Sequence, residues 1–303
     1  MGHIQLPLAG IEVWWPGLIL LGAFIGILTG LFGVGGGFLL TPCLKIFFGI
    51  PYPIAVGSGL AQIFLAGAYS TWKHAKNGHI DLRMGLILGG GALVGTDIGV
   101  ELLKMLGTGG TVHLNARAFT VSDLVMTGLF LVLMTATTIY IAYETSRCNG
   151  DEEASAIAQN LQGCRVPPRL AFPKSKIDSL SLWFPLIISF LVGILTGMLG
   201  VGGGFINFPL LVYVIGVPTY VAVGTSAFQI LFSSGYGALR HALQGHVEWL
   251  LVLLLLVGSL AGVRFGVYLS GLWGGRKLRK YFAWVIGLGI AVIVWDLARK
   301  IWF

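Results

Sequence analysis

Two glycine-rich stretches hold the residues of this sequence that are best suited to bind a ligand. GILTGLFGVGGGFLLTP covers residues 26–42, and GILTGMLGVGGGFINFP covers residues 193–209. Glycine disfavours a helix, so each cluster predicts a break inside an otherwise apolar helical run. The N–H groups freed there can bind an anion, because the next helix begins with the positive end of its dipole and no side chain blocks the approach. The binding candidates in the two clusters are Gly33, Gly35, Gly36, Gly37, Gly200, Gly202, Gly203 and Gly204.

A second duplicated piece follows each glycine cluster. It reads AVGSGLAQ at residues 55–62 and AVGTSAFQ at residues 222–229. Its hydroxyls lie near the expected start of the next helix and its glutamine lies one turn further on, where a ligand could meet them. Amides inside a membrane span also form bonds between helices, so both roles stay open. The substrate-binding candidates in this piece are Ser58, Gln62, Thr225, Ser226 and Gln229.

Close packing is the alternative explanation for the glycines, because small residues let membrane helices approach one another. The density of the GVGGG run, and its presence in two copies, favours a ligand site over packing alone. A nucleotide site is disfavoured, since G-K-[ST] is missing and no strand precedes the glycines. The many N–H donors fit a tetrahedral or pyramidal oxyanion, which offers several acceptor oxygens.

Two charged residues occupy matching positions in long apolar segments of the two halves. Asp97 lies in GALVGTDIGV, and Arg264 lies in GSLAGVRFGV. Charges at that depth are costly and are usually paired or functional. We expect Asp97 and Arg264 to form an intramembrane charge pair. The alternative is that Asp97 carries a proton or that Arg264 attracts the anion.

The composition predicts an integral membrane protein. The 303 residues are 56% hydrophobic and 10% charged, whereas soluble domains carry about 25% charged residues. The apolar runs have the length of helices rather than of barrel strands, so the fold class is an all-α polytopic protein embedded in the lipid bilayer. The formal charge of +7 is assigned to cytoplasmic loops and not to nucleic-acid binding.

The chain carries a long internal repeat. A shift of 167 positions aligns residues 26–82 with residues 193–249, with about 25 identities among 57 pairs. We therefore expect a first transmembrane repeat at residues 1–143, a polar linker at 144–180 and a second transmembrane repeat at 181–303. Each repeat is expected to hold two short apolar segments around its glycine cluster, followed by three longer membrane helices.

The short segments admit two arrangements. One broken helix that spans the membrane would make the repeats parallel, whereas a glycine-broken re-entrant helix pair would make them inverted. In the inverted arrangement basic residues gather with the linker on one face, and the positive-inside rule then places that face in the cytoplasm and both termini outside. The basic residues of that face are Lys73, Lys76, Arg83, Arg276, Lys277, Arg279 and Lys280.

No catalytic residue, metal site or cofactor is predicted, and we do not expect an enzyme. Carboxylates in the apolar segments are dispersed, and Cys43, Cys148 and Cys164 have no metal or redox spacing. An ATP-binding signature is also missing, so any transport would be secondary or channel-like.

The paired blocks G-x-x-x-G-x-x-G-V-G-G-G-F-x-x-x-P, each followed by A-V-G-[ST], resemble the TauE/SafE family of anion permeases, the sulfite exporter family. The likeness covers both halves apart from the linker and the termini. It implies a secondary transporter for sulfite, an organosulfonate or a related sulfur oxyanion in the cytoplasmic membrane of a prokaryote, in many cases an exporter. As site residues it implies only the glycine and A-V-G-[ST] positions.

Other functions differ from export in what they require. An anion channel would need a continuous polar stripe, and an uptake carrier would take another small anion such as thiosulfate or a carboxylate. A membrane enzyme would need clustered catalytic groups, and a scaffold would use the linker as a docking site. The coupling ion (none, proton or sodium) and the oligomeric state, with a homodimer as one option, stay open at this stage.

Overall fold

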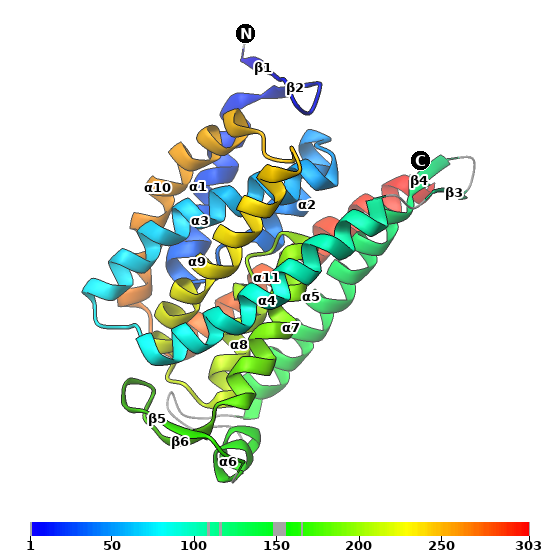
Figure 1. Cartoon of the computed structure of the whole chain (residues 1–303). Helices are drawn as coiled ribbons and strands as arrows, with labels where there is room; N and C mark the ends of the chain where they lie inside the picture. Colours follow the sequence, from blue (N-terminus) through cyan, green and yellow to red (C-terminus); the bar gives the residue numbers. More distant parts are fainter. Residues whose placement is uncertain (1, 108–109, 115–116, 148–155, 165, 303) are drawn as a thin grey trace.

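The chain folds mainly into helices (Figure 1). The computed structural model describes residues 2–107, 110–114, 117–147, 156–164 and 166–302. The helices are α1 (Trp15–Phe32), α2 (Gly37–Phe48), α3 (Tyr52–Lys76), α4 (Leu82–Gly107), α5 (Val121–Arg147), α6 (Ala156–Gly163), α7 (Trp183–Leu199), α8 (Gly204–Pro209), α9 (Thr219–Leu243), α10 (Trp249–Leu272) and α11 (Gly275–Trp302). A π-helical turn (Leu210–Ile215) continues α8 without a break.

Six of the described helices are long and apolar enough to cross a membrane, namely α1, α3, α4, α5, α10 and α11. Helix α9 has the same 25-residue length as α3. It carries a series of buried polar side chains that include Thr225, Gln229 and Ser233. The prediction of a helical, multi-pass membrane protein is confirmed.

In the part of the chain that the structure describes, three short antiparallel hairpins lie outside the helices. They are formed by β1 (His3–Leu6) with β2 (Ile11–Trp14), β3 (Thr111–Leu114) with β4 (Arg117–Thr120), and β5 (Arg169–Phe172) with β6 (Ile177–Ser181). The first hairpin leads into α1 and the third leads into α7, and they lie at opposite ends of the molecule (Figure 1). The segment expected to be a polar linker therefore contains ordered elements, α6 and the third hairpin with its 3₁₀ turn (Pro173–Ser175).

Helices that precede residues 144–180 pack against helices that follow them. Helix α1 lies along α10, and α4 lies along α7. Glycines line both contacts: a Cβ on Gly26 would clash with the backbone of Ser259, and a Cβ on Gly95 would clash with the backbone of Phe190. Such contacts need glycine because the helix backbones touch directly. The two halves of the chain thus interleave instead of forming separate bundles.

The chain reverses direction between α1 and α2. A Cβ on Gly17, near the start of α1, would lie 3.3 Å from the ring of Phe48 at the end of α2. The second half does the same, because α6 contacts both β6, which leads into α7, and the π-helical turn that follows α8. The amide of Gln162 in α6 also donates to the carbonyl of Ile215 at 2.9 Å. These short helices therefore return towards the end from which they came.

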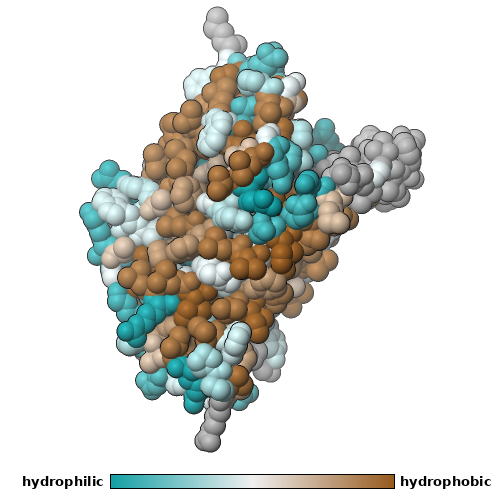
Figure 2. Space-filling model, viewed as in Figure 1, coloured by the Kyte–Doolittle hydropathy of each residue, from teal (hydrophilic) through white to brown (hydrophobic). Residues whose placement is uncertain are grey.

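The remaining helices pack around the short helices α2 and α8. Helices α3 and α9 pack on each other, and α5 pairs with α11 along one side (Figure 1). Large apolar side chains are exposed to the outside, for example Trp284 at 71% and Leu20 at 64%. Figure 2 shows apolar residues over much of the visible face. A surface of this kind suits lipid rather than water.

Candidate functional site

Two glycine loops occupy the breaks that the sequence predicts. The first glycine loop is residues 33–36 between α1 and α2, and the second is residues 200–203 between α7 and α8. Three glycines in each loop have positive φ: 64°, 74° and 65° at Gly33, Gly35 and Gly36, and 70°, 74° and 81° at Gly200, Gly202 and Gly203. Other residues adopt this backbone only at a cost of about 1–2 kcal/mol. Glycine is therefore what lets the chain turn here.

The two glycine loops lie directly against each other. A Cβ on Gly37 would lie 2.7 Å from the carbonyl oxygen of Gly200, and one on Gly204 would collide with Val34. Helices α2 and α8 start at these glycines, Gly37 and Gly204. Two helix N-terminal ends, whose first N–H groups lack intrahelical acceptors and whose dipole ends are positive, thus begin at one buried place.

Apolar side chains enclose the contact between the loops. Ile63 of α3 and Ile230 of α9 both approach Gly35 and Gly202. A Cβ on Gly35 would lie 2.7 Å from Cγ2 of Ile63 and 3.5 Å from Cγ2 of Ile230. The glycines therefore provide close packing in this conformation, and the loops are occluded.

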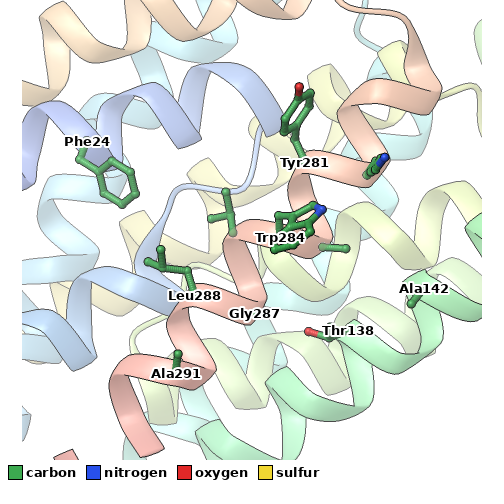
Figure 3. A pocket seen from close by; sticks show the side chains of 11 residues that line it. Phe24, Thr138, Ala142, Tyr281, Trp284, Gly287, Leu288 and Ala291 are labelled. Atoms are coloured by element: carbon green, nitrogen blue, oxygen red, sulfur yellow. The ribbon is translucent and has the colours of Figure 1, made fainter. Parts of the chain in front are cut away.

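A cavity of about 950 Å³ lies elsewhere, between α1, α5 and α11 (Figure 3). Phe24, Thr138 and Trp284 are among the residues that line it, and the lining is largely apolar. None of the glycine-loop residues contributes to it. Its chemistry suits hydrocarbon and not a small anion.

Ser58 and Thr225 hold loop backbone rather than face the glycines. The Oγ of Ser58 accepts a hydrogen bond of 2.9 Å from the N–H of Glu248, and Oγ1 of Thr225 accepts one of 3.0 Å from the N–H of Asp81. Ser226 does reach a glycine loop, because its Oγ donates to the carbonyl of Gly33 at 3.0 Å. The three hydroxyls therefore lock α3 and α9 to segments of the other half.

The two candidate glutamines have different surroundings. Gln229 accepts a 2.6 Å hydrogen bond from Nδ2 of Asn207 and donates to Ser233, whose Oγ lies 3.1 Å from the carbonyl of Gly202 and donates to it. Gln62 instead donates to Ser259 of α10 at 2.9 Å. Gln229 is thus linked to the second glycine loop, whereas Gln62 bonds to a neighbouring helix.

Two buried amide oxygens have no hydrogen-bond partner among the described residues. They are Oε1 of Gln62 and Oδ1 of Asn207, on side chains that are fully buried. Ser233 and Ser259 are not among the residues predicted from the sequence. A usable signal was present for Ser233, because it lies four residues after Gln229 on the same helix face.

The expected pair between Asp97 and Arg264 is wrong. Asp97 lies 2.8 Å from Nε of Arg240 and accepts a 3.0 Å hydrogen bond from the hydroxyl of Tyr236. The reason is the packing, because α4 contacts α7 and α9, whereas α10 contacts α1 and α3. Arg264 is exposed on α10.

Two acidic residues, Asp81 and Glu248, bind segments outside the helices. Neither is among the residues predicted from the sequence. The carboxylate of Asp81 accepts hydrogen bonds from Ser175 at 2.7 Å and from the N–H of Met84 at 3.1 Å, which caps the start of α4. The carboxylate of Glu248 accepts a 2.7 Å bond from the N–H of Leu8. Each acidic residue directly precedes a helix of the structure, α4 after Asp81 and α10 after Glu248.

The described residues contain no group of three or more His, Cys, Asp or Glu side chains placed to hold a metal ion. The chemistry at the glycine loops consists of backbone N–H groups, hydroxyls and amides. These groups bind and orient a ligand by hydrogen bonds, and nothing among them is arranged as a nucleophile with its base.

Comparison with known proteins gives a consistent picture. The family described as "Sulfite exporter TauE/SafE" matches residues 18–293. The probable membrane transporter protein YunE of Bacillus subtilis is 28% identical over 260 residues, which cover 84% of this chain and 87% of that protein. A probable membrane transporter protein of Xylella fastidiosa is 25% identical over 278 residues, covering 90% and 92% of the two chains.

A shorter match is found in a plant. Sulfite exporter TauE/SafE family protein 6 of Arabidopsis thaliana is 41% identical over 64 residues, or 21% of this chain and 14% of that protein. No solved structure matches this chain significantly.

Proposed function

Because the chain belongs to the sulfite exporter TauE/SafE family, whose matched members are named membrane transporters and not enzymes, we propose that it carries a small sulfur-containing anion across the membrane. The favoured substrate is sulfite or an organosulfonate, and the favoured direction is out of the cytoplasm. A negative-inside membrane potential assists the exit of an anion, so export needs no ATP.

The contact between the two glycine loops is the observation that carries the proposal. Helices α2 and α8 begin at Gly37 and Gly204, which lie against the opposite loop. If the loops move apart, the N–H groups of both helix starts face one space from two sides. A sulfur oxyanion with several acceptor oxygens fits such a set of donors.

The occluded state favours a transporter over an open channel. The loops touch each other and are closed in by Ile63 and Ile230. An anion can reach them only after one group of helices moves relative to another, which is the behaviour expected for alternating access. An anion channel, or an uptake carrier for thiosulfate or a carboxylate, is the second candidate.

Matching contacts in the two halves support a pair of inverted repeats. The ring of His74 bonds to the carbonyl of Gly30, and the ring of His241 bonds to that of Gly197, 167 positions later in both cases. The bond between Asp81 and Thr225 has its counterpart in the bond between Glu248 and Ser58. The first and third hairpins lie at opposite ends of the molecule, as inversion requires (Figure 1).

The distribution of basic residues suggests how the protein is oriented in the membrane. The third hairpin and α6 lie at the end of the molecule where α3 ends and α4 begins, because Ser175 bonds to Asp81. Lys73 and Lys76 are near that end of α3, and Nζ of Lys76 lies 3.9 Å from the ring centroid of Trp72. Basic residues beside an aromatic anchor favour a cytoplasmic interface. We therefore place this end in the cytoplasm of a prokaryotic cell.

Thermal stabilisation of the purified protein tests the substrate class. The panel is sulfite, sulfoacetate, taurine and thiosulfate, with sulfate, phosphate, acetate and chloride for comparison. A ligand that binds only the folded protein raises Tm with its occupancy. A selective rise with sulfite or an organosulfonate supports the proposal. A rise only with acetate or thiosulfate favours the second candidate, and no rise in folded protein contradicts anion binding.

A further inference from the structure

Two buried histidines hold the ends of the helices that lead into the glycine loops. Nε2 of His74 donates to the carbonyl of Gly30 at 3.0 Å, and Nε2 of His241 donates to the carbonyl of Gly197 at 3.3 Å. A carbonyl oxygen only accepts, so Nε2 carries the hydrogen in both rings. Both carbonyls belong to the last turn of α1 or α7, directly before a glycine loop.

The second nitrogen of each ring is buried without a partner. The side chains of His74 and His241 are 1% and 0% exposed, and Nδ1 of each has no hydrogen-bond partner among the described residues. With the hydrogen on Nε2, Nδ1 presents a free lone pair that can take a proton. The C-terminal end of a helix stabilises the cation that results.

A second histidine lies close to each buried ring. The rings of His74 and His79 have centroids 6.2 Å apart, and those of His241 and His246 are 5.9 Å apart. His79 and His246 are in the loops after α3 and α9. Partial burial lowers the pKa of both, so they are neutral near pH 7 and can accept a proton and pass it on.

On the His74 side, no carboxylate among the described residues is placed to neutralise a proton on the buried ring. Helix α1 contains no titratable side chain, and Asp81, two residues beyond His79, is engaged by Ser175 and by the start of α4. The other titratable side chains on α3 and on the elements packed against it include Tyr69, Lys73 and Lys76 on α3, Tyr236 and Arg240 on α9, and Arg264 and Tyr268 on α10. The ring centroid of Tyr220 is 5.6 Å from that of His79.

On the His241 side, the charged neighbours already have partners. Helix α7 contains no titratable side chain, and Arg240 is paired with Asp97 and lies near Glu101 of α4. Glu248, two residues beyond His246, accepts the N–H of Leu8. A protonated ring on either side therefore needs a further negative charge nearby, and an anion at the glycine loops would supply it.

We propose that His74 and His241 each bind a proton together with the transported anion, so that transport moves protons and the anion in the same direction. With two protons a dianion crosses without net charge, so its own concentration gradient drives export, and assistance by the membrane potential applies only to export without protons. The proton passes from water to His79 or His246, then to Nδ1 of the buried ring, and it leaves with the anion on the other side. This inference rests on the proposed function and adds the coupling ion to it.

The first test is the pH dependence of anion binding by the full-length protein. Sulfoacetate, methanesulfonate and sulfate serve as probes, because their charges do not change near neutral pH. The apparent Kd from thermal stabilisation should rise by roughly tenfold per pH unit for each proton taken up, on the alkaline side of the imidazole range. If only sulfite binds, its apparent Kd is corrected at each pH for the fraction of sulfite that is present as the dianion.

The outcomes separate the two proposals. Anion binding with the same affinity at all these pH values overturns the proton inference and leaves the anion site intact. If no sulfur anion binds at any pH, the proposed function fails, and the proton inference fails with it.

Variants distinguish proton binding from a structural role. His74→Gln and His241→Gln keep an N–H donor for the helix carbonyl but cannot take a proton. Each should reduce the pH dependence, and the double variant should remove it while binding at high pH stays within about twofold of the unchanged protein. His3→Gln, at an exposed site in β1, is the matched control. If the double variant keeps the full pH dependence, the rings act only as helix caps and the inference is overturned.

Discussion

The ring of Phe38 stacks on the ring of Phe205, with centroids 5.5 Å apart and planes inclined by 25°. Each is the second residue of a short helix that starts from a glycine loop. Phe282 of α11 covers the stack, with its centroid 6.2 Å from that of Phe38 and 5.1 Å from that of Phe208. Any motion that separates the glycine loops must also move these rings.

Alanine at the third left-handed glycine of a loop should destabilise the protein. Gly36 has a φ of 65°, and a Cβ there would lie 2.6 Å from Cγ2 of Ile25. We expect Gly36→Ala to lower the unfolding free energy by about 2 kcal/mol, since a left-handed residue costs 1–2 kcal/mol before the clash is counted. Gly203→Ala, with a φ of 81°, should behave alike.

Gly90→Ala is the matched control, because a Cβ at this position in α4 would have no neighbour within 4 Å. Alanine is favoured over glycine inside a helix by about 1 kcal/mol, so this variant should keep or raise Tm. Equal stability of Gly36→Ala and Gly90→Ala in detergent melting curves would contradict the backbone argument.

Removing the hydroxyl of Thr225 should leave the N–H of Asp81 without its 3.0 Å acceptor in a buried place. The expected loss for Thr225→Val is about 1–3 kcal/mol, which is typical of an unsatisfied buried polar group. Thr225→Ser keeps the oxygen and should lose less than half as much. The melting temperatures of the two variants measure these losses of stability. An equal loss in both would show that the methyl group contributes more than the hydrogen bond.

Asp97 should be energetically coupled to Arg240 and not to Arg264. The carboxylate is 2.8 Å from Nε of Arg240, but both side chains are partly exposed, at 46% and 33%. A double-mutant cycle with Asp97→Asn and Arg240→Gln should give a coupling of about 0.5–1 kcal/mol. The same cycle with Arg264→Gln should be additive, and coupling there instead would contradict the observed pairing.

Chemical labelling should place the linker and the first hairpin on opposite sides of the membrane. In a Cys148→Ser background, Cys164 is partly exposed and Cys43 is buried. A membrane-impermeant maleimide should label Cys164 only when it has access to the cytoplasmic face. Leu8→Cys, at a site that is 47% exposed, should be labelled only from the other face. Labelling of both from one face would exclude inverted repeats.

The breaks between the short helices could be predicted from the sequence because their cause is local. Glycine adopts positive φ at little cost, and the two dense clusters marked the places where the chain breaks before α2 and α8. The roles of Ser58 and Thr225 could not be read in the same way. Their partners, Glu248 and Asp81, lie 190 and 144 residues away.

The error at Asp97 has a geometric cause. Aligning the halves identifies equivalent positions. Two equivalent residues touch each other only where both lie near the axis that relates the halves. Phe38 and Phe205 lie there and stack. Asp97 and Arg264 are on helices that pack against different neighbours, and apolar periodicity does not say which helix faces which.

The third hairpin was missed for a different reason. Residues 169–181 contain short strands without a clear alternation, and they read as a polar joint. Their position depends on a side-chain contact, the bond from Ser175 to Asp81, which no local pattern announces. The first hairpin is tied down in a comparable way by the bond from Leu8 to Glu248.

Flux through the purified protein is the most direct test of the proposal that this chain transports a sulfur-containing anion. Proteoliposomes are loaded with sulfite or sulfoacetate, a potential that is negative inside is imposed, and efflux of the anion is followed over time. We expect saturable efflux for which other sulfur anions compete, which chloride does not affect, and which Gly36→Ala reduces at equal amounts of folded protein. Efflux no faster than from protein-free liposomes, for every sulfur anion, would contradict it.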